Sequence, residues 1–160
     1  EENNIVLCME NHSSVHPDAD GILAIIKAVG SENLKTNPDP TNFCKNHTEV
    51  SKDAREIIYK ETEKLAPLTA NAHLKINTFD KTGKPEFVDV PRIMDIYRKF
   101  GYDGDMVLEY FGERKPDEAI KNGIKYLKEI GADIATEISE EYSLKELINL
   151  LWLGFNRKQE

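Results

Sequence analysis

The sequence predicts an α/β fold built from parallel strand–helix units, and three observations lead to this prediction. Short apolar segments alternate with longer segments in which apolar residues recur every three or four positions, as in an amphipathic helix. This alternation occurs four times, and a parallel strand pairing needs a crossover that a helix can provide. Helical segments also stop at glycines, such as Gly30 and Gly101.

The first two units occupy roughly the first 65 residues. Residues 5–9 (IVLCM) suit a buried strand, and Asp18 or Asp20 can cap the helix that follows. The second unit has a shorter, more polar strand at residues 34–37 and a helix from about residue 51. The helix residues expected to be buried are Ile22, Leu23, Ile25, Ile26, Val29, Ile57, Ile58, Thr62 and Leu65.

The third unit starts at Thr69, and residues 81–84 (KTGK) are typical of a turn between two extended arms. Pro91 then begins a helix, as proline often does. The fourth unit has a strand at residues 106–111 and a helix at residues 116–130. The buried side of these two helices is expected to contain Ile93, Met94, Ile96, Tyr97, Ile120, Ile124, Tyr126 and Leu127.

The pattern changes after Gly131. Residues 143–155 (SLKELINLLWLGF) are apolar on nearly every side, which predicts a helix that needs burial. This helix either completes the core or contacts a second chain. The expected organisation is therefore a domain of four strand–helix units at residues 1–131 and a C-terminal extension at residues 132–160.

Composition argues against several classes of protein. The net charge of −8 makes a nucleic acid an unfavourable partner, because such binding depends on Lys and Arg contacts to phosphates. No apolar run reaches the roughly 18 residues of a membrane span. Cys8 and Cys44 are too few for a disulfide scaffold, so free thiols and a cytoplasmic location are expected. A processed, secreted form is the alternative, because the chain begins with Glu1 rather than Met.

A side chain that can bind a metal lies at or near the end of each predicted strand: Glu10, Asp39, His73 and Glu109. They are about 30 to 36 residues apart, one strand–helix unit each, so parallel strands would bring them to the same face. Three converging carboxylates repel one another, and a divalent cation would neutralise them. Taken singly, each residue also has an ordinary explanation, as a solvated carboxylate or a hydrogen-bonded core histidine. Spacing alone leaves both interpretations open.

Four segments, "MENHSS", "NLKTNPDPTNF", "AHLKIN" and "GYDGDMVLEYFGE", carry a family resemblance. In order and spacing they resemble the second half of the sugar phosphate isomerase/epimerase family, the xylose isomerase-like TIM barrels. The resemblance covers residues 5–130 and implies strands five to eight of an eight-stranded barrel, without the N-terminal half. Such a half barrel would be a fragment of a longer protein, would pair with a second copy, or would use its C-terminal helix to cover the opening. A fragment, or a dimer of fragments, is the favoured expectation.

The resemblance also implies a site. Glu10, Asp39, His73 and Glu109 would bind one divalent metal, with Mn²⁺ expected and Mg²⁺, Zn²⁺ or Co²⁺ as alternatives. Glu10 and Glu109 would form the catalytic pair: one removes a proton beside a carbonyl, the metal stabilises the enediolate, and the other returns a proton.

Three neighbouring residues, His12, Asn42 and Lys75, are candidates for substrate binding because each lies within a few positions of a proposed ligand. Two positions depart from the pattern of some sugar epimerases. Those enzymes carry a histidine where this chain has Asn42, and an arginine where it has Phe79. The departures argue against assigning a specific ketose epimerase activity, and they leave the metal ligands intact.

The predicted function is a divalent-metal-dependent isomerase or epimerase of a small-molecule sugar or sugar phosphate. A dehydratase of the inosose dehydratase type shares the same enolisation step. The alternative from another class is a noncatalytic fragment that binds a metal or a sugar. An AP endonuclease is disfavoured, because this acidic chain does not suit a DNA-facing surface. No nucleic-acid or membrane partner is expected.

Overall fold

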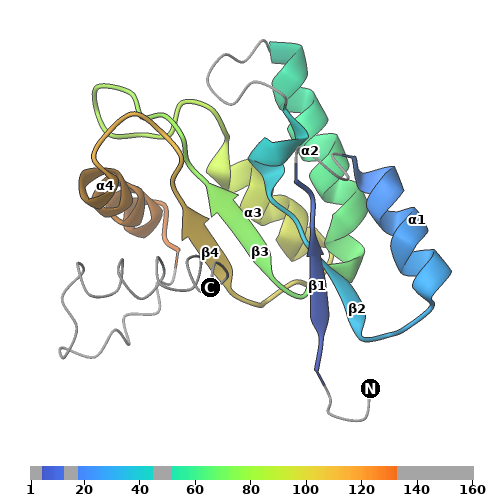
Figure 1. Ribbon diagram of the computed structural model, residues 1–160. Coiled ribbons are helices and arrows are strands. Elements are labelled where there is room, and N and C mark those ends of the chain that lie inside the picture. Colours follow the sequence, from blue (N-terminus) through green and yellow to red (C-terminus); the bar gives the residue numbers. More distant parts are fainter. Residues whose placement is uncertain (1–4, 13–17, 45–51, 133–160) are drawn as a thin grey trace, which may run out of the picture. The chain divides into compact units, whose positions relative to one another are not determined.

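The computed structural model describes residues 5–12, 18–44 and 52–132 (Figure 1). Strands and helices alternate along this part of the chain: β1 (Leu7–Glu10), α1 (Ala19–Val29), β2 (Leu34–Asn37), α2 (Lys52–Leu65), β3 (Ala72–Lys75), α3 (Val90–Lys99), β4 (Met106–Glu109) and α4 (Pro116–Glu129). Two short 3₁₀ helices, η1 (Pro40–Phe43) and η2 (Ala66–Leu68), flank α2.

The chain divides into two compact units, residues 1–123 and residues 124–160. The four strands and helices α1 to α3 belong to the first unit. The predicted apolar helix at residues 143–155 lies outside the described residues, and so does most of the predicted extension at 132–160. The predicted domain boundary therefore stays a prediction.

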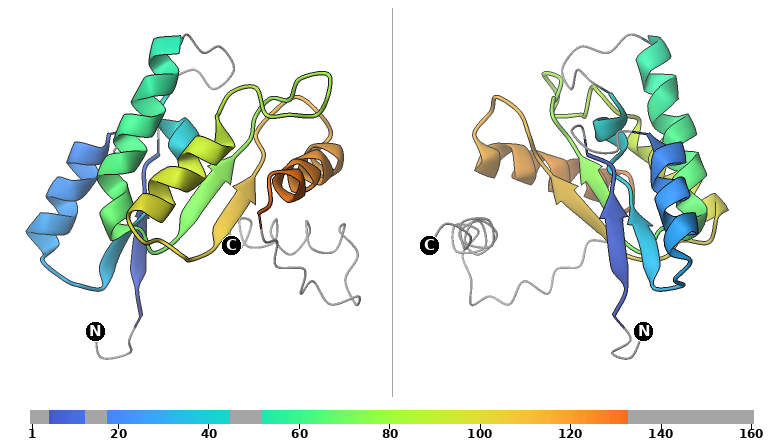
Figure 2. Two further views of the ribbon diagram at one scale, coloured as in Figure 1. Left: turned by 180° about the vertical axis from the view of Figure 1, so that it is seen from behind. Right: turned by 45° about the vertical axis from the view of Figure 1, so that its right-hand side comes forward.

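The described strands pair in parallel. β1 pairs with β2, so that Glu10 lies opposite Asn37, and β3 pairs with β4, so that Lys75 lies opposite Glu109. An isolated parallel bridge at Thr36 joins β2 to the segment before β3, and the strands therefore follow one another in chain order (Figure 2). Parallel strands connected by helices confirm the predicted α/β class. The assignment to the second half of a barrel stays a prediction.

The helix ends form where the sequence predicts them. Asp18 caps α1, since its carboxylate accepts a hydrogen bond from Gly21 N at 2.6 Å. Gly30 ends the helix with φ at 67°, a left-handed conformation that glycine adopts without a steric cost. Asp89 caps α3 through Arg92 N at 3.2 Å. These caps mark both ends of α1 and the start of α3.

Helices α1, α2 and α3 cover one face of the sheet (Figure 2). Of the predicted core residues, Ile22, Ile58 and Leu65 are fully buried. Two predictions were wrong: Ile57 is 49% exposed and Val29 is 58% exposed. Val29 is the last residue of α1, beyond the buried Ile26, and Ile57 lies about 100° around α2 from the buried Ile58.

Helix α4 differs from the prediction in which residues it buries. The buried residues are Ala119 and Gly123, whereas the predicted Ile120 and Ile124 are only half-buried, as are Tyr126 and Leu127. A Cβ added to Gly123 would lie 3.1 Å from Leu108 Cδ2, so this turn of the helix lies very close to β4. Small residues occupy the contact because larger ones do not fit there.

The predicted burial of the first strand was wrong. Ile5, Val6 and Leu7 are 60%, 48% and 65% exposed. Within the described residues, β1 pairs with a strand on one side only, β2. The predicted turn at residues 81–84 is confirmed by an antiparallel bridge between Phe79 and Pro85.

Neither Cys8, which is exposed, nor Cys44, which is buried, forms a disulfide. Among the described residues, no helix combines the length and the apolar character needed to cross a membrane.

Candidate metal centre at the carboxyl ends of the strands

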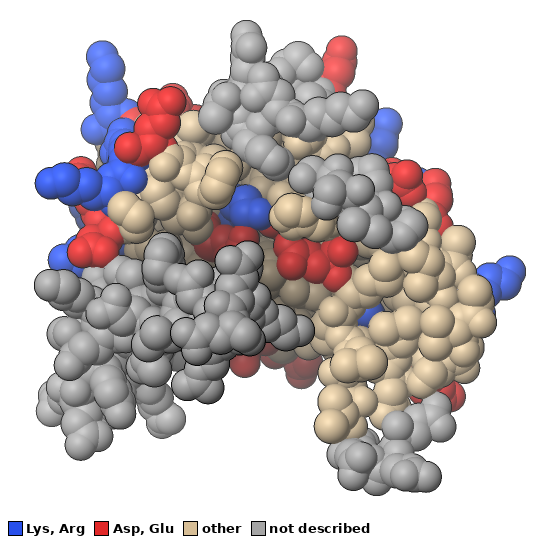
Figure 3. All heavy atoms as spheres, in the orientation of Figure 1, with Lys and Arg blue, Asp and Glu red and all other residues tan. Residues whose placement is uncertain are grey.

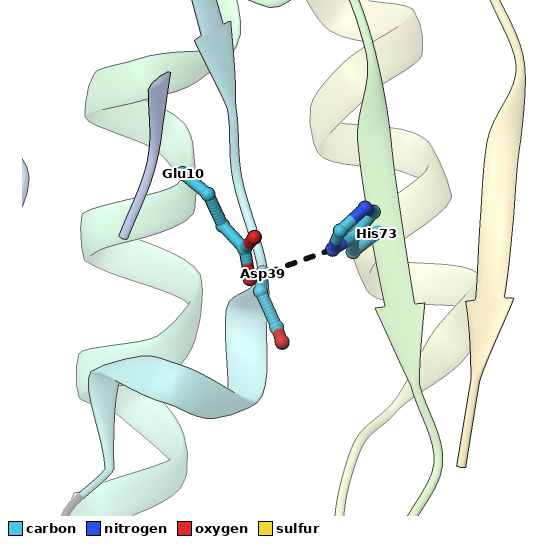
Figure 4. A group of neighbouring side chains, drawn as sticks. All are labelled: Glu10, Asp39 and His73. Atoms are coloured by element: carbon cyan, nitrogen blue, oxygen red, sulfur yellow. Dashed lines mark ion pairs between the residues drawn. The ribbon is translucent and has the colours of Figure 1, made fainter. Parts of the chain in front are cut away.

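Three of the four predicted ligands meet at the carboxyl ends of the strands. Glu10 is the last residue of β1, Asp39 caps η1 just after β2, and His73 lies in β3. One ligand atom from each lies within 4.8 Å of the other two. In Figure 4 the imidazole of His73 faces the carboxylates of Glu10 and Asp39. Figure 3 shows acidic side chains, with basic atoms beside them, near the middle of the face turned to the viewer.

Strand alternation explains why β3 contributes two polar groups to the site. Successive side chains of a strand point to opposite faces. Ala72 and Leu74 are buried, whereas His73 and Lys75 share the other face. Lys75 thereby reaches the same carboxylates as the imidazole does.

Glu109, the fourth predicted ligand, lies at the edge of this group. Its Oε1 is 3.2 Å from His73 Nδ1, and its Oε2 is 3.2 Å from Lys75 Nζ. Glu10 Oε1 lies 3.5 Å from the same Nδ1. The two glutamates proposed as a catalytic pair thus approach one imidazole nitrogen from β1 and from β4.

Asp39 is completely buried and firmly oriented. Its Oδ1 accepts hydrogen bonds from Thr41 N at 3.1 Å and Thr41 Oγ1 at 3.0 Å. Its backbone N–H donates to Asn11 Oδ1 at 2.7 Å, and its carbonyl accepts from Asn11 Nδ2 at 2.8 Å. With Oδ1 held in this way, Oδ2 faces the cluster, where Lys75 Nζ binds it.

Asn42 and Lys75, both predicted to bind substrate, lie inside the cluster and bind its carboxylates. Asn42 Nδ2 donates to Glu10 Oε1 at 3.3 Å and to Asn11 O at 3.0 Å. Asn42 Oδ1 accepts from Lys75 Nζ at 3.1 Å. His12, the third candidate, is exposed near Glu10. Substrate binding by these three residues stays a prediction.

Two hydrogen-bonded asparagines orient His73 through Nε2, the ring nitrogen on the side away from the carboxylates. His73 Nε2 lies 3.1 Å from Asn37 Nδ2, and Asn71 Nδ2 donates to Asn37 Oδ1 at 3.0 Å. Nδ1, the other ring nitrogen, is buried without a hydrogen bond and faces the carboxylates. Nδ1 is therefore the nitrogen that a metal would bind. For Nε2 to carry the proton, both amides would turn, so that Asn37 Oδ1 accepts from Nε2 and Asn71 Oδ1 accepts from Asn37 Nδ2.

The ionisable groups of the cluster shift one another's pKa values. His73 holds the pKa of Glu10 below its ordinary value, although burial acts in the opposite direction. The carboxylate of Glu10 raises the pKa of His73 against the effect of burial, and Glu109 and Asp39 add to the rise. Burial by itself would lower the pKa of Lys75, but Asp39 and Glu109 raise it overall. Cationic forms of His73 and Lys75 are thus favoured beside three carboxylates.

The donor set fits a divalent ion. Carboxylate oxygens with one imidazole nitrogen suit Mn²⁺ or Mg²⁺ and also permit Zn²⁺ or Co²⁺. The buried Nδ1 of His73 lies 3.5 Å from Glu10 Oε1 and 3.2 Å from Glu109 Oε1, so imidazole and carboxylate donors lie within reach of one ion. Residues Glu10, Asp39 and His73 can hold it, with Glu109 close enough to join.

A pocket of about 260 Å³ lies among the loops that follow β3 and β4, with Asn77, Phe79, Tyr110 and Arg114 in its wall. Tyr110 directly follows Glu109 in the chain. The Arg114 guanidinium lies over the Phe79 ring, 5.8 Å from its centroid, and donates to Phe79 O at 3.1 Å. A guanidinium thus lies near the position where some sugar epimerases carry an arginine, although it comes from the loop between β4 and α4.

Sequence reasoning missed three residues that shape the site: Asn11, Asn37 and Asn71. Asn11 and Asn37 bond directly to the proposed ligands Asp39 and His73, and Asn71 bonds to Asn37. The only signal in the sequence is their position, at or just outside a predicted strand, where a polar side chain needs a partner.

Comparison with known proteins identifies the family of the chain. The sequence model of the xylose isomerase-like TIM barrel family matches residues 1–130. No curated protein matches the chain. The family match covers most of the sequence, all four described strands and all four proposed ligands. The chain therefore belongs to the xylose isomerase-like TIM barrel family.

Proposed function

We propose that this chain is a divalent-metal-dependent isomerase or epimerase of a sugar or sugar phosphate, and that it acts by removing a proton next to a carbonyl. One observation carries the proposal: Glu10, Asp39 and His73 converge within 4.8 Å in a chain of this family. A divalent ion bound there supplies Lewis-acid stabilisation of the negative charge that develops on a substrate oxygen. Mn²⁺ is the ion we propose, because the set is rich in carboxylate oxygen.

Glu10 and Glu109 are the proposed proton carriers. Both contact His73 Nδ1, Glu10 from β1 and Glu109 from β4. A substrate carbon held between two carboxylates can lose a proton to one and gain a proton from the other, which inverts its configuration. Return of the proton to the neighbouring carbon gives isomerisation instead. Asp39, whose Oδ1 is fully engaged by Thr41, is proposed as a ligand only.

The pocket beside Glu109 is the proposed place for the rest of the substrate. Its wall combines the Phe79 and Tyr110 rings, whose centroids are 6.4 Å apart, with the charged side chains of Glu86 and Arg114. Apolar surface with a few polar groups is typical of small-molecule sites, and aromatic rings suit the C–H faces of a sugar.

A noncatalytic binding function is the second candidate, and one observation favours it. Asn42 and Lys75, the groups expected to bind substrate, are already bound to Glu10 and Asp39. Metal or sugar binding without turnover would be compatible with this arrangement. The dehydratase alternative uses the same proton abstraction, and product analysis separates it from isomerisation.

Deuterium incorporation tests the proposed function. The 160-residue chain, reconstituted with Mn²⁺, is incubated with a panel of ketoses and ketose phosphates in D₂O, and sugars are analysed by mass spectrometry. We expect one deuterium at the carbon beside the carbonyl with wild type and with Glu32→Gln, an exposed control, and none with Glu10→Gln. Metal-loaded protein that exchanges no proton across the panel would instead support the binding function. Undiminished exchange by Glu10→Gln would remove Glu10 from the catalytic pair.

A further inference from the structure

Asp39 offers a single oxygen to the centre of the cluster. Oδ1 accepts two hydrogen bonds from Thr41, one from its backbone and one from its hydroxyl. Oδ2 points the other way and is bound by the ammonium group of Lys75. The oxygen that a metal would use is therefore the oxygen that a lysine already uses.

The ammonium group of Lys75 is surrounded by acceptors. Nζ contacts Asp39 Oδ2, Glu109 Oε2 at 3.2 Å and Asn42 Oδ1 at 3.1 Å. An ammonium group has three N–H donors, so these three acceptors account for all of them. The side chain is only 11% exposed, and Asp39 is fully buried. The ammonium group of Lys75 thus occupies the place that a metal ion would take, with oxygen atoms on several sides.

We propose that Lys75 is an internal counter-ion of the metal centre, and that a divalent ion displaces its ammonium group from Asp39 and Glu109 when it binds. The proposal rests on the metal centre of the proposed function. Two cations that share one carboxylate oxygen repel each other strongly in a partly buried site, where the effective dielectric constant is low. The lysine is the mobile partner, because its charge sits at the end of a flexible four-carbon stem.

The exchange has a consequence for the site. Lys75 loses Asp39 and Glu109, two of its three acceptors, when the ion enters, and its ammonium group becomes available to a negatively charged or oxygen-rich ligand beside the ion. Metal binding and the release of a donor are then one event. In the opposite arrangement, Lys75 stays bound to Asp39 and orients it for the ion. Removing the lysine would then weaken Mn²⁺ binding instead of strengthening it.

The Mn²⁺ affinity of a variant without the Lys75 charge shows whether the lysine competes with the ion or helps to bind it. Lys75→Met removes the charge and keeps the length of the side chain, whereas Lys81→Met changes an exposed lysine of the loop after β3. Titration of the metal-stripped full chain with Mn²⁺ is expected to show about tenfold tighter binding by Lys75→Met. Lys81→Met should bind as wild type does. Equal or weaker binding by Lys75→Met would overturn the proposal.

A second measurement uses only the wild-type chain, in case Lys75→Met does not fold. Amine acylation at fixed pH is followed by peptide mass spectrometry, with and without Mn²⁺. The reactivity of Lys75 is expected to rise several-fold when Mn²⁺ is present, whereas that of Lys81 stays constant. An unchanged or lower reactivity of Lys75 in Mn²⁺-bound protein would contradict the exchange.

The outcomes separate this proposal from the proposed function. Mn²⁺ binding with release of Lys75 but without deuterium incorporation into any sugar would overturn the catalytic function alone. Mn²⁺ binding without tighter binding by Lys75→Met would overturn the exchange alone. Failure of both wild type and Lys75→Met to bind Mn²⁺ would overturn the metal centre and the exchange together.

Discussion

Asn11 and Asp39 are joined by a reciprocal pair of hydrogen bonds between one side chain and one backbone. Asn11 Oδ1 accepts from Asp39 N at 2.7 Å, and Asn11 Nδ2 donates to Asp39 O at 2.8 Å. Both residues are fully buried. The amide therefore ties the end of β1 to the end of β2 at the point where Glu10 and Asp39 must converge.

Asn11→Ala should destabilise the protein and weaken metal binding. The substitution leaves a buried N–H and a buried carbonyl without their partner, which costs about 2–3 kcal/mol of unfolding free energy. Chemical denaturation of the metal-stripped chain measures this loss. Asn33→Ala is the control, because Asn33 donates a single exposed hydrogen bond to Ile5 O. A loss no greater than that of the control would show that the pair does not hold the strands together.

Asn37→Ala should weaken the affinity of the chain for Mn²⁺. Asn37 is the contact of His73 Nε2, and an outer partner that fixes the orientation of a metal-binding imidazole commonly contributes tenfold to 100-fold in affinity. Asn71→Ala removes only the next hydrogen bond of the chain and should have a smaller effect in the same direction. Titration with Mn²⁺ measures the affinities of wild type, Asn71→Ala and Asn37→Ala, which should decrease in this order. Equal affinities would exclude a positioning role for Asn37.

The fold could be predicted from the sequence where local signals act. Asp18, Gly30 and Pro91 mark helix ends through backbone chemistry that depends on neighbouring residues alone. The spacing of Glu10 and His73 indicated a common face because each strand–helix unit has a similar length.

The rest depends on contacts between distant parts of the chain. Asn11 and Asn37 find partners 28 and 36 residues away, and no local pattern distinguishes them from other asparagines. Lys75 was predicted to meet a substrate, since sequence spacing does not reveal that its strand register places it opposite Glu109. Gly123 could not be identified as buried, because the closeness of α4 to β4 is a property of the packed helix.

Gly112→Ala should disturb the pocket among the loops that follow β3 and β4. A Cβ at this position would lie 2.2 Å from Asn77 O and 2.6 Å from Tyr110 Oη, so one of the two loops must move. We expect a loss of about 1–3 kcal/mol in unfolding free energy, measured by chemical denaturation. Gly83→Ala is the contrast, since its Cβ would meet no atom within 4 Å and only the backbone, at φ 87°, is strained. A smaller loss for Gly112→Ala than for Gly83→Ala would contradict the close approach of the loops.

The stability of the metal-stripped protein should depend on pH through His73 and Glu10. The pKa of His73 is raised in the folded state, so its contribution is complete below its ordinary value of about 6.5 and is lost as the pH rises through the folded value. The pKa of Glu10 is lowered, so its contribution is complete above about 4.5 and is lost as the pH falls through the folded value. Together they predict maximal stabilisation from this pair between about pH 4.5 and 6.5.

Urea denaturation of wild type and His73→Gln across pH 4 to 9 measures this effect. The unfolding free energy of wild type should decline as the pH rises above about 6.5, because the folded state then loses the proton that pairs His73 with the carboxylates. His73→Gln cannot carry that proton, and its profile should be flatter over the same interval. A parallel decline in both proteins would assign the pH dependence to other groups, and a rise in wild type above pH 6.5 would reverse the sign inferred from the contact of His73 with Glu10.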